Sequence, residues 1–293
     1  MKIITADPTG LCFGVKRAIT AVERALGKYG TVYAIGSPIH NPQEVARLGS
    51  MGLKVVQSET EVPDGAVAFI RAHGAAPSVL DALRLKNVHV IDGTCPFVRV
   101  VQKRAQELSK AGYHLLILGD EKHPEVQGIM AYATEKCTVI TPGRNFLPST
   151  ISLSSDRIHK LGLVAQTTQE ERLLADAARA VVGLADELRV YNTICHATIE
   201  RQKAVAKLAT EADGVIIIGG HNSANTGKLY RIAGASGCDV TWIEQASQLD
   251  DGWVRGHKVI GIAAGASTPD WLIKQLIDAI NTIAGRQGDV NHE

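Results

Sequence analysis

Residues 2–26 read KIITADPTGLCFGVKRAITAVERAL, which is an apolar run, a polar turn, a cysteine and then an amphipathic helical pattern. The same order returns in VHVIDGTCPFVRVVQKRAQEL at 88–108 and in LRVYNTICHATIERQKAVAKL at 188–208. The three cysteines are Cys12, Cys95 and Cys195. Self-similarity at a spacing of about 80 to 100 residues predicts three related structural units in place of one doubly wound sheet.

Short apolar runs alternate with helical patterns along the whole chain, which predicts parallel α/β units. Strands are expected at 2–5, 31–35, 52–56, 66–70, 88–91, 114–118, 138–140, 161–164, 189–191, 215–218, 240–243 and 259–263. We therefore predict an α/β protein of three similar domains in a pseudo-threefold trefoil arrangement. The domains span 13–94, 95–194 and 195–293, and an N-terminal strand in 1–12 leads to the first cysteine. In such an arrangement the three repeated cysteines meet near the axis.

The composition argues against several classes of protein. Hydrophobic side chains make up 45% of the 293 residues, enough for real cores, and 31 Lys and Arg balance 30 Asp and Glu. A near-neutral chain is not expected to bind nucleic acid. No apolar run reaches the roughly 18 residues of a membrane span, and Asp7 and Pro8 interrupt the start of the chain. We expect a cytoplasmic protein without a membrane partner, and a monomer.

Polar side chains recur in the turns that follow the strands of each repeat. After the second strand, the turns hold His40, then His123, then Ser223 and Asn225; after the third strand, they hold His73, then Thr167 and Thr168, then Ser267. Proline marks the first helical turn after several of them, so these residues stand between a strand end and a helix N-terminus. Such edges bind ligands in parallel α/β proteins, and helix N-termini favour anions. The pattern predicts a phosphate or diphosphate site.

The five cysteines divide into two groups. Cys137 and Cys238 align with Leu53 of the first repeat, so we interpret them as core thiols. Cys12, Cys95 and Cys195 recur at one position, which favours a metal site. No Cys-x-x-Cys pair is present. Zinc with a histidine as fourth ligand remains open, but widely spaced thiolates suit an iron–sulfur cluster better. With three thiolates, one iron of a four-iron cluster would have no cysteine ligand.

Glu125 stands two residues after His123, in the first turn of a predicted helix, and is our candidate proton donor. Thr167 is expected to position a water or relay a proton. The helical pattern at 198–211, with Arg201, Lys203 and Lys207, is interpreted as a solvated face, on which an acidic electron carrier could also dock.

The blocks GLCFGVKRAI, VPDGA, AHG, GTCPFV, HPEVQG, QTT, ICHAT with RQ, NSANT and AGASTPD follow one another between residues 3 and 285. Together they resemble the 4-hydroxy-3-methylbut-2-enyl diphosphate reductases of the non-mevalonate isoprenoid pathway. The resemblance implies a [4Fe-4S] cluster held by Cys12, Cys95 and Cys195, which becomes [3Fe-4S] when the open iron is lost. It also implies reduction of the substrate to isopentenyl and dimethylallyl diphosphate, with electrons from a ferredoxin or flavodoxin.

The same resemblance implies the roles of individual side chains. Glu125 would serve the proton relay with help from Thr167, and the substrate would contact His40, His73, His123, Thr167, Thr168, Ser223, Ala224, Asn225 and Ser267. The chain departs from the family at Ala224, where only the backbone can bind, and at His196, where an aromatic residue is common. A zinc-stabilised or metal-free diphosphate-binding module is the alternative interpretation.

Overall fold

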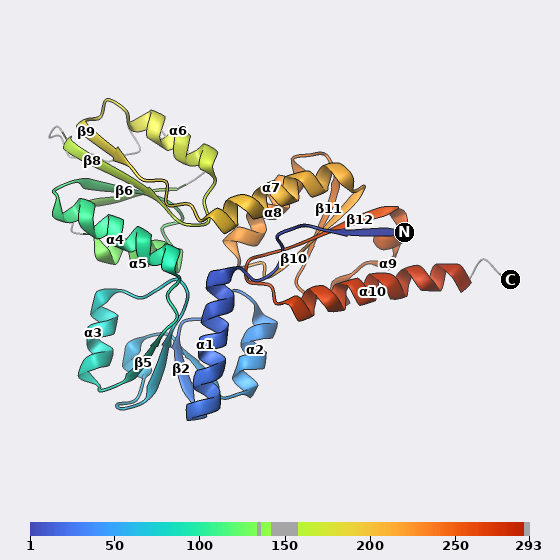
Figure 1. Cartoon of the computed structure of the whole chain (residues 1–293), viewed down its shortest axis with the longest axis horizontal. Helices are drawn as coiled ribbons and strands as arrows, with labels where there is room; N and C mark the ends of the chain where they lie inside the picture. The colour runs from blue at the N-terminus through green and yellow to red at the C-terminus, as the bar shows by residue number, and fades with distance from the viewer. Residues whose placement is uncertain (134–135, 142–157, 290–293) are drawn as a thin grey trace. The chain divides into compact units, whose positions relative to one another are not determined.

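The computed structural model describes residues 1–133, 136–141 and 158–289 (Figure 1). Within them, twelve strands form three parallel sheets of four strands each. The predicted α/β class with three related units is confirmed, and each strand expected from the sequence is present to within a few residues at its ends.

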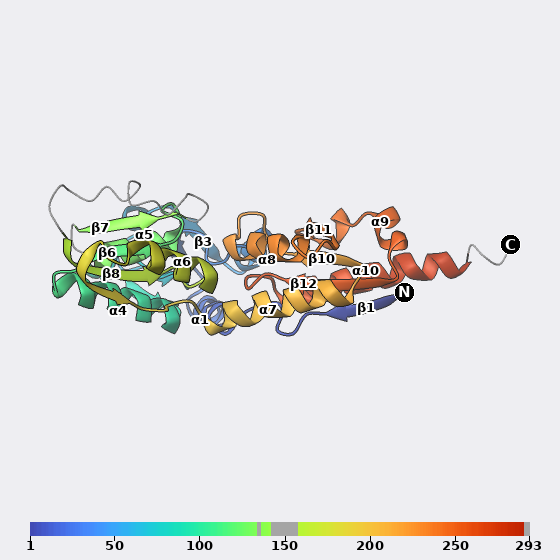
Figure 2. The same ribbon diagram turned by 90° about the horizontal axis from the view of Figure 1, so that it is seen from above.

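The three sheets share one strand order. The first runs β3 (Leu53–Val56), β2 (Val32–Ile35), β4 (Val67–Ile70), β5 (His89–Asp92); the second runs β7 (Cys137–Ile140), β6 (His114–Leu118), β8 (Ile158–Ala165), β9 (Ala185–Val190). The third runs β11 (Asp239–Ile243), β10 (Gly214–Ile218), β12 (Val259–Ala264), β1 (Lys2–Thr5). Figure 2 shows this third order from β11 at the upper edge to β1 at the lower edge. The N-terminal strand therefore takes the place that β5 and β9 occupy in the other sheets.

Helices connect these strands. They are α1 (Phe13–Tyr29), α2 (Pro42–Ser50), α3 (Pro77–Leu85), α4 (Pro96–Lys110), α5 (Pro124–Tyr132), α6 (Glu171–Val181), α7 (His196–Glu211), α8 (Ala224–Gly234), α9 (Asp251–Gly256) and α10 (Asp270–Asp289), with short 3₁₀ turns at Glu59–Glu61 and Ala246–Gln248. Four of them begin with proline, whose fixed φ and missing N–H suit the first helical position. No helix among the described residues combines the length and the apolar character needed to cross a membrane.

Contacts divide the chain into two compact units. One holds Met1–Lys16, Ile39–Leu48 and His196–Glu293, and the other holds Arg17–Pro38 and Gly49–Cys195. The third sheet lies in the former unit, and the first and second sheets lie in the latter. The domain boundaries expected from the sequence stay a prediction.

The core of the third sheet explains why its strands read as unbroken apolar runs. Ile216 and Ile218 pack with Leu276 of α10 on one face, whereas Val215 and Ile217 pack with residues of α7 and α8 on the other. Strands buried on both faces need apolar side chains at every position, because successive residues point to opposite sides.

Helices α4 and α7 each pack closely against a strand at a position where that strand has a glycine. A Cβ on Gly162 of β8 would lie 2.8 Å from Leu108, and one on Gly261 of β12 would lie 2.8 Å from Leu208. Leu108 and Leu208 each stand thirteen residues after a repeated cysteine, Cys95 or Cys195. The repeat thus extends to the packing of each helix that follows a cysteine.

We expect Gly162→Ala to lower the free energy of unfolding by about 1–3 kcal/mol, because the added methyl overpacks the contact with Leu108. Gly27 is an exposed position in α1, and a methyl group added there would meet no described atom within 4 Å, so Gly27→Ala should raise the same quantity by about 0.5–1 kcal/mol. Urea unfolding followed by circular dichroism measures both. Equal midpoints for Gly162→Ala and the parent would contradict the expected overpacking.

Candidate active site

Each repeated cysteine makes the same backbone hydrogen bond. The N–H of Cys95 donates to the carbonyl of Ala72 at 2.9 Å, and that of Cys195 donates to Thr167 at 2.9 Å. In the other unit, the N–H of Cys12 donates to Ala266 at 3.1 Å. Each acceptor lies in the turn after the third strand of a sheet, β4, β8 or β12. All three cysteines are therefore held against the carboxyl edge of a parallel sheet.

The residue after each acceptor is a predicted ligand of the substrate. These residues are His73 after Ala72, Thr168 after Thr167, and Ser267 after Ala266. All three are partly buried. The alignment of His73, Thr168 and Ser267 made from the sequence thus coincides with equivalent local geometry.

Cys137 and Cys238 behave as core thiols. Cys137 of β7 packs against the apolar cluster around Leu115 and Ile117, and Cys238 packs against the cluster between α7, α8 and the third sheet. Burial raises the pKa of Cys137 to about 11, and burial also raises the pKa of Cys238. Both therefore stay protonated near neutral pH and make poor metal ligands.

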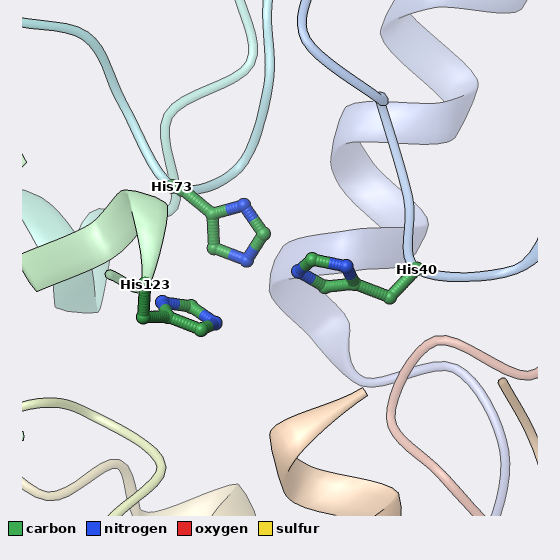
Figure 3. Close-up of side chains that lie close together, drawn as sticks. All are labelled: His40, His73 and His123. Atoms are coloured by element: carbon green, nitrogen blue, oxygen red, sulfur yellow. The ribbon is translucent and has the colours of Figure 1, made fainter. Parts of the chain in front are cut away.

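His123 caps helix α5. Its Nδ1 accepts a hydrogen bond of 3.1 Å from the N–H of Glu125. An accepting Nδ1 places the proton of the neutral ring on Nε2, so this nitrogen is the one that donates. The side chains of His73 and His123 lie edge to face, with ring centroids 5.1 Å apart (Figure 3). Two imidazole rings from two different turns therefore stand together in one unit.

The carboxylate of Glu125 is fixed by Thr167. The backbone N–H of Thr167 donates to Oε1 at 2.6 Å, and its hydroxyl donates to Oε2 at 2.8 Å. Glu125 is 1% exposed and Thr167 is 6% exposed. A buried carboxylate with two donors is held in one orientation, as a group that transfers a proton must be. The sequence predicts that these two residues act together, and the structure places them in direct contact.

His40 and His123 do not occupy quite the same position. In the first repeat the side chain that caps the helix is Asn41, whose Oδ1 accepts the N–H of Glu44 at 2.8 Å. Asn41 therefore takes the capping position that His123 has in the second repeat, and His40 lies one residue before it. His40 belongs to the unit that contains the third sheet. Alignment of the repeats missed Asn41, although Asn before Pro42 is a common helix-start signal.

Helix α8 begins at the third of these turns. The hydroxyl of Ser223 accepts the N–H of Thr226 at 3.3 Å, and Ala224 offers only its backbone. Asn225 is 6% exposed, and neither its Oδ1 nor its Nδ2 has a hydrogen-bond partner among the described residues. A buried amide with both ends unsatisfied is costly unless a ligand completes it. Asn225 is therefore a strong candidate for contact with a bound molecule.

Two further residues were not recognised from the sequence. Gln166 is 1% exposed, and its Oε1 accepts the N–H of Asp120, so it joins the turn after β8 to the turn after β6. Arg201 was interpreted as part of a solvated face, and this is wrong. It is 4% exposed and donates to the carbonyl of Gly10 at 2.9 Å, which fastens the loop before Cys12 to helix α7. Helical periodicity alone cannot show that a loop covers a cation.

Comparisons with known proteins agree with the residue patterns. The model of the LytB protein family matches residues 3–281. The 4-hydroxy-3-methylbut-2-enyl diphosphate reductase of Geotalea daltonii is 41% identical over 97% of this chain and 98% of its own length. The enzyme of the same name from Aquifex aeolicus is 42% identical, with the same coverage of both chains.

Two solved structures are also similar. One is described as (E)-4-hydroxy-3-methyl-but-2-enyl diphosphate reductase, the terminal enzyme of the non-mevalonate pathway; it is 40% identical, with a TM-score of 0.73, and the match covers 96% of this chain and 99% of that one. The other is the E-1-hydroxy-2-methyl-but-2-enyl-4-diphosphate reductase of Plasmodium falciparum, 26% identical, with a TM-score of 0.87 and coverage of 94% and 87%. Because the family match and these relatives span nearly the whole sequence, the chain belongs to the LytB protein family.

Proposed function

We propose that this protein is a 4-hydroxy-3-methylbut-2-enyl diphosphate reductase. It removes the allylic hydroxyl of its substrate as water, consumes two electrons and two protons, and releases isopentenyl or dimethylallyl diphosphate. This proposal rests on relatives whose names state that activity. The alignments with them cover 97% of this chain and 98% of each relative. All three repeats, with their cysteines and turns, lie inside that match.

Cys12, Cys95 and Cys195 are the proposed ligands of a [4Fe-4S] cluster. Their equivalent backbone bonds support this choice, and so do the apolar surroundings of Cys137 and Cys238, which raise the pKa of both thiols. Three thiolates are soft ligands that suit iron and sulfide. When bound, the cluster supplies the electrons and a Lewis-acidic iron for cleavage of the carbon–oxygen bond.

The diphosphate is proposed to bind at the helix N-termini. His123 points Nε2–H away from the helix it caps, and Asn225 offers an amide that no described residue pairs. His40, His73, Thr168, Ser223, Ser267 and the backbone of Ala224 complete the proposed set. Neutral donors and helix dipoles favour a compact anion without fully neutralising its charge, which leaves product release possible.

Glu125 is proposed as the proton donor and Thr167 as its relay. The Thr167 hydroxyl donates to Oε2 of the carboxylate, and it can instead accept when Glu125 carries the proton. A proton can therefore pass from Glu125 through this hydroxyl to the substrate. The electrons are proposed to arrive singly from a ferredoxin or flavodoxin.

Anaerobically purified protein should be brown and contain about four iron and four sulfide ions per chain. Cys95→Ser should lose the open-site cluster and all turnover, whereas Cys137→Ala should keep both, because only the former thiol is a proposed ligand. Metal and sulfide analysis with the visible spectrum measures this. A colourless parent with one zinc per chain would support the zinc-stabilised alternative instead.

Glu125→Gln should slow reductive turnover by about 10²- to 10⁴-fold, the usual contribution of a general acid, with a much smaller change in KM. Glutamine keeps the shape and can still accept the N–H of Thr167. Glu121→Gln, at an exposed position in the turn before α5, is the control and should keep parental turnover. If Glu125→Gln also keeps it, the acid is another group.

A further inference from the structure

A cavity lies in the unit that contains the first and second sheets. Its volume is about 430 Å³, within the range of about 300–1,000 Å³ typical of small-molecule sites. Ile35, Ile70, Ala76 and Val79 form apolar walls, and the side chains of Arg71 and Lys122 also line it. None of these residues is a proposed ligand of the substrate or the cluster.

Arg71 is a partly buried cation to which no described residue supplies a counter-ion. Among those residues, its guanidinium makes one hydrogen bond, a long one of 3.5 Å to the carbonyl of Ser37. The group packs flat against Gly36, where a Cβ would lie 2.9 Å from Cζ. Burial also lowers the pKa of Arg71, because desolvation disfavours the charged guanidinium. A bound anion would compensate it.

Lys122 supplies the second positive charge. It is exposed, and no ion pair involves its ammonium group in the described parts of the chain. Asp120 and Glu121 precede it, but neither lines the cavity. The described lining therefore combines apolar walls with two cations and no carboxylate. This composition fits a small organic anion that carries an apolar group.

The residues that follow His73 and His123 both line the cavity. Gly74 follows His73, Pro124 follows His123, and both line the cavity. Gly74 has a φ of 77°, so its turn has little freedom to accept a side chain. An occupant would therefore contact the two turns that carry the facing imidazoles, although neither imidazole lines the cavity.

We propose that this cavity is a second ligand site, which binds a short-chain prenyl diphosphate next to the His73 and His123 turns. Arg71 and Lys122 would hold the diphosphate, and Ile70 and Val79 would contact the prenyl group. The choice of ligand rests on the proposed function, because that reaction generates prenyl diphosphates beside this site.

Calorimetric titration of the oxidised holoenzyme with dimethylallyl diphosphate tests the proposal, since no turnover occurs without reductant. The parent should bind two equivalents. Lys122→Glu should weaken one of the two sites at least about tenfold, because it places a carboxylate beside the ligand. Ala131→Trp, which fills the cavity from the exposed side of α5, should abolish the same site. Lys110→Glu is the matched control outside the cavity and should keep both equivalents.

A parent that binds a single equivalent, or two variants that both retain the second, would overturn the proposal. Titration with inorganic diphosphate separates the contribution of the apolar walls to the affinity from that of the two cations. Inorganic diphosphate should bind the cavity more weakly than the prenyl ligand. Equal affinity would show that the apolar walls contribute nothing and would contradict the proposal. Reductive turnover of 4-hydroxy-3-methylbut-2-enyl diphosphate is measured separately on the parent. Its absence would count against the proposed function, whatever the titration shows.

Discussion

Thr167 joins the carboxylate of Glu125 to Cys195, a proposed cluster ligand, through three hydrogen bonds. Its N–H and hydroxyl hold the two oxygens of Glu125, and its carbonyl accepts the N–H of Cys195. Glu125 in turn donates its own N–H to His123. A continuous chain of short contacts thus links an imidazole, a carboxylic acid and a proposed cluster ligand. Displacement of any member would move the others, which is how a buried polar network keeps one geometry.

The same backbone bond recurs in the other repeats with different side chains. Ala72 in the first repeat and Ala266 in the third stand at the position of Thr167. Of the three repeats, only the second therefore has a hydroxyl at this position to bind the Glu125 carboxylate. The neighbouring position is occupied by Gln166 in the second repeat and by Arg71 in the first. Gln166 accepts from the turn beside it, whereas Arg71 donates to the carbonyl of Ser37. At these positions the second repeat therefore supplies a hydroxyl that binds Glu125, and the first repeat supplies a cation that no described residue pairs with a carboxylate.

Much of this arrangement was predictable because it depends on local pattern. The apolar strands, the prolines at helix starts and the spacing of the cysteines are periodic signals that tertiary packing preserved. The offset between His40 and His123 was not predictable, since one added residue before Pro42 moves the cap to Asn41 without changing the pattern. The burial of Arg201 was missed because its acceptor, Gly10, lies almost two hundred residues away in sequence. The orphaned amide of Asn225 is likewise visible only once its described neighbours are placed.

The pairing of β1 with β12 has a consequence for how the protein is made. Lys2 to Thr5 lie beside Val259 to Ile262, so β1 can pair with β12 only after more than two hundred further residues have been synthesised. Until then the loop that carries Cys12 has no carbonyl of Ala266 to bind. The first and second sheets are built from contiguous chain and can form during translation, whereas the third sheet closes last. Cys12, one of the three proposed cluster ligands, is therefore held in its described position only after Ala266 has been synthesised.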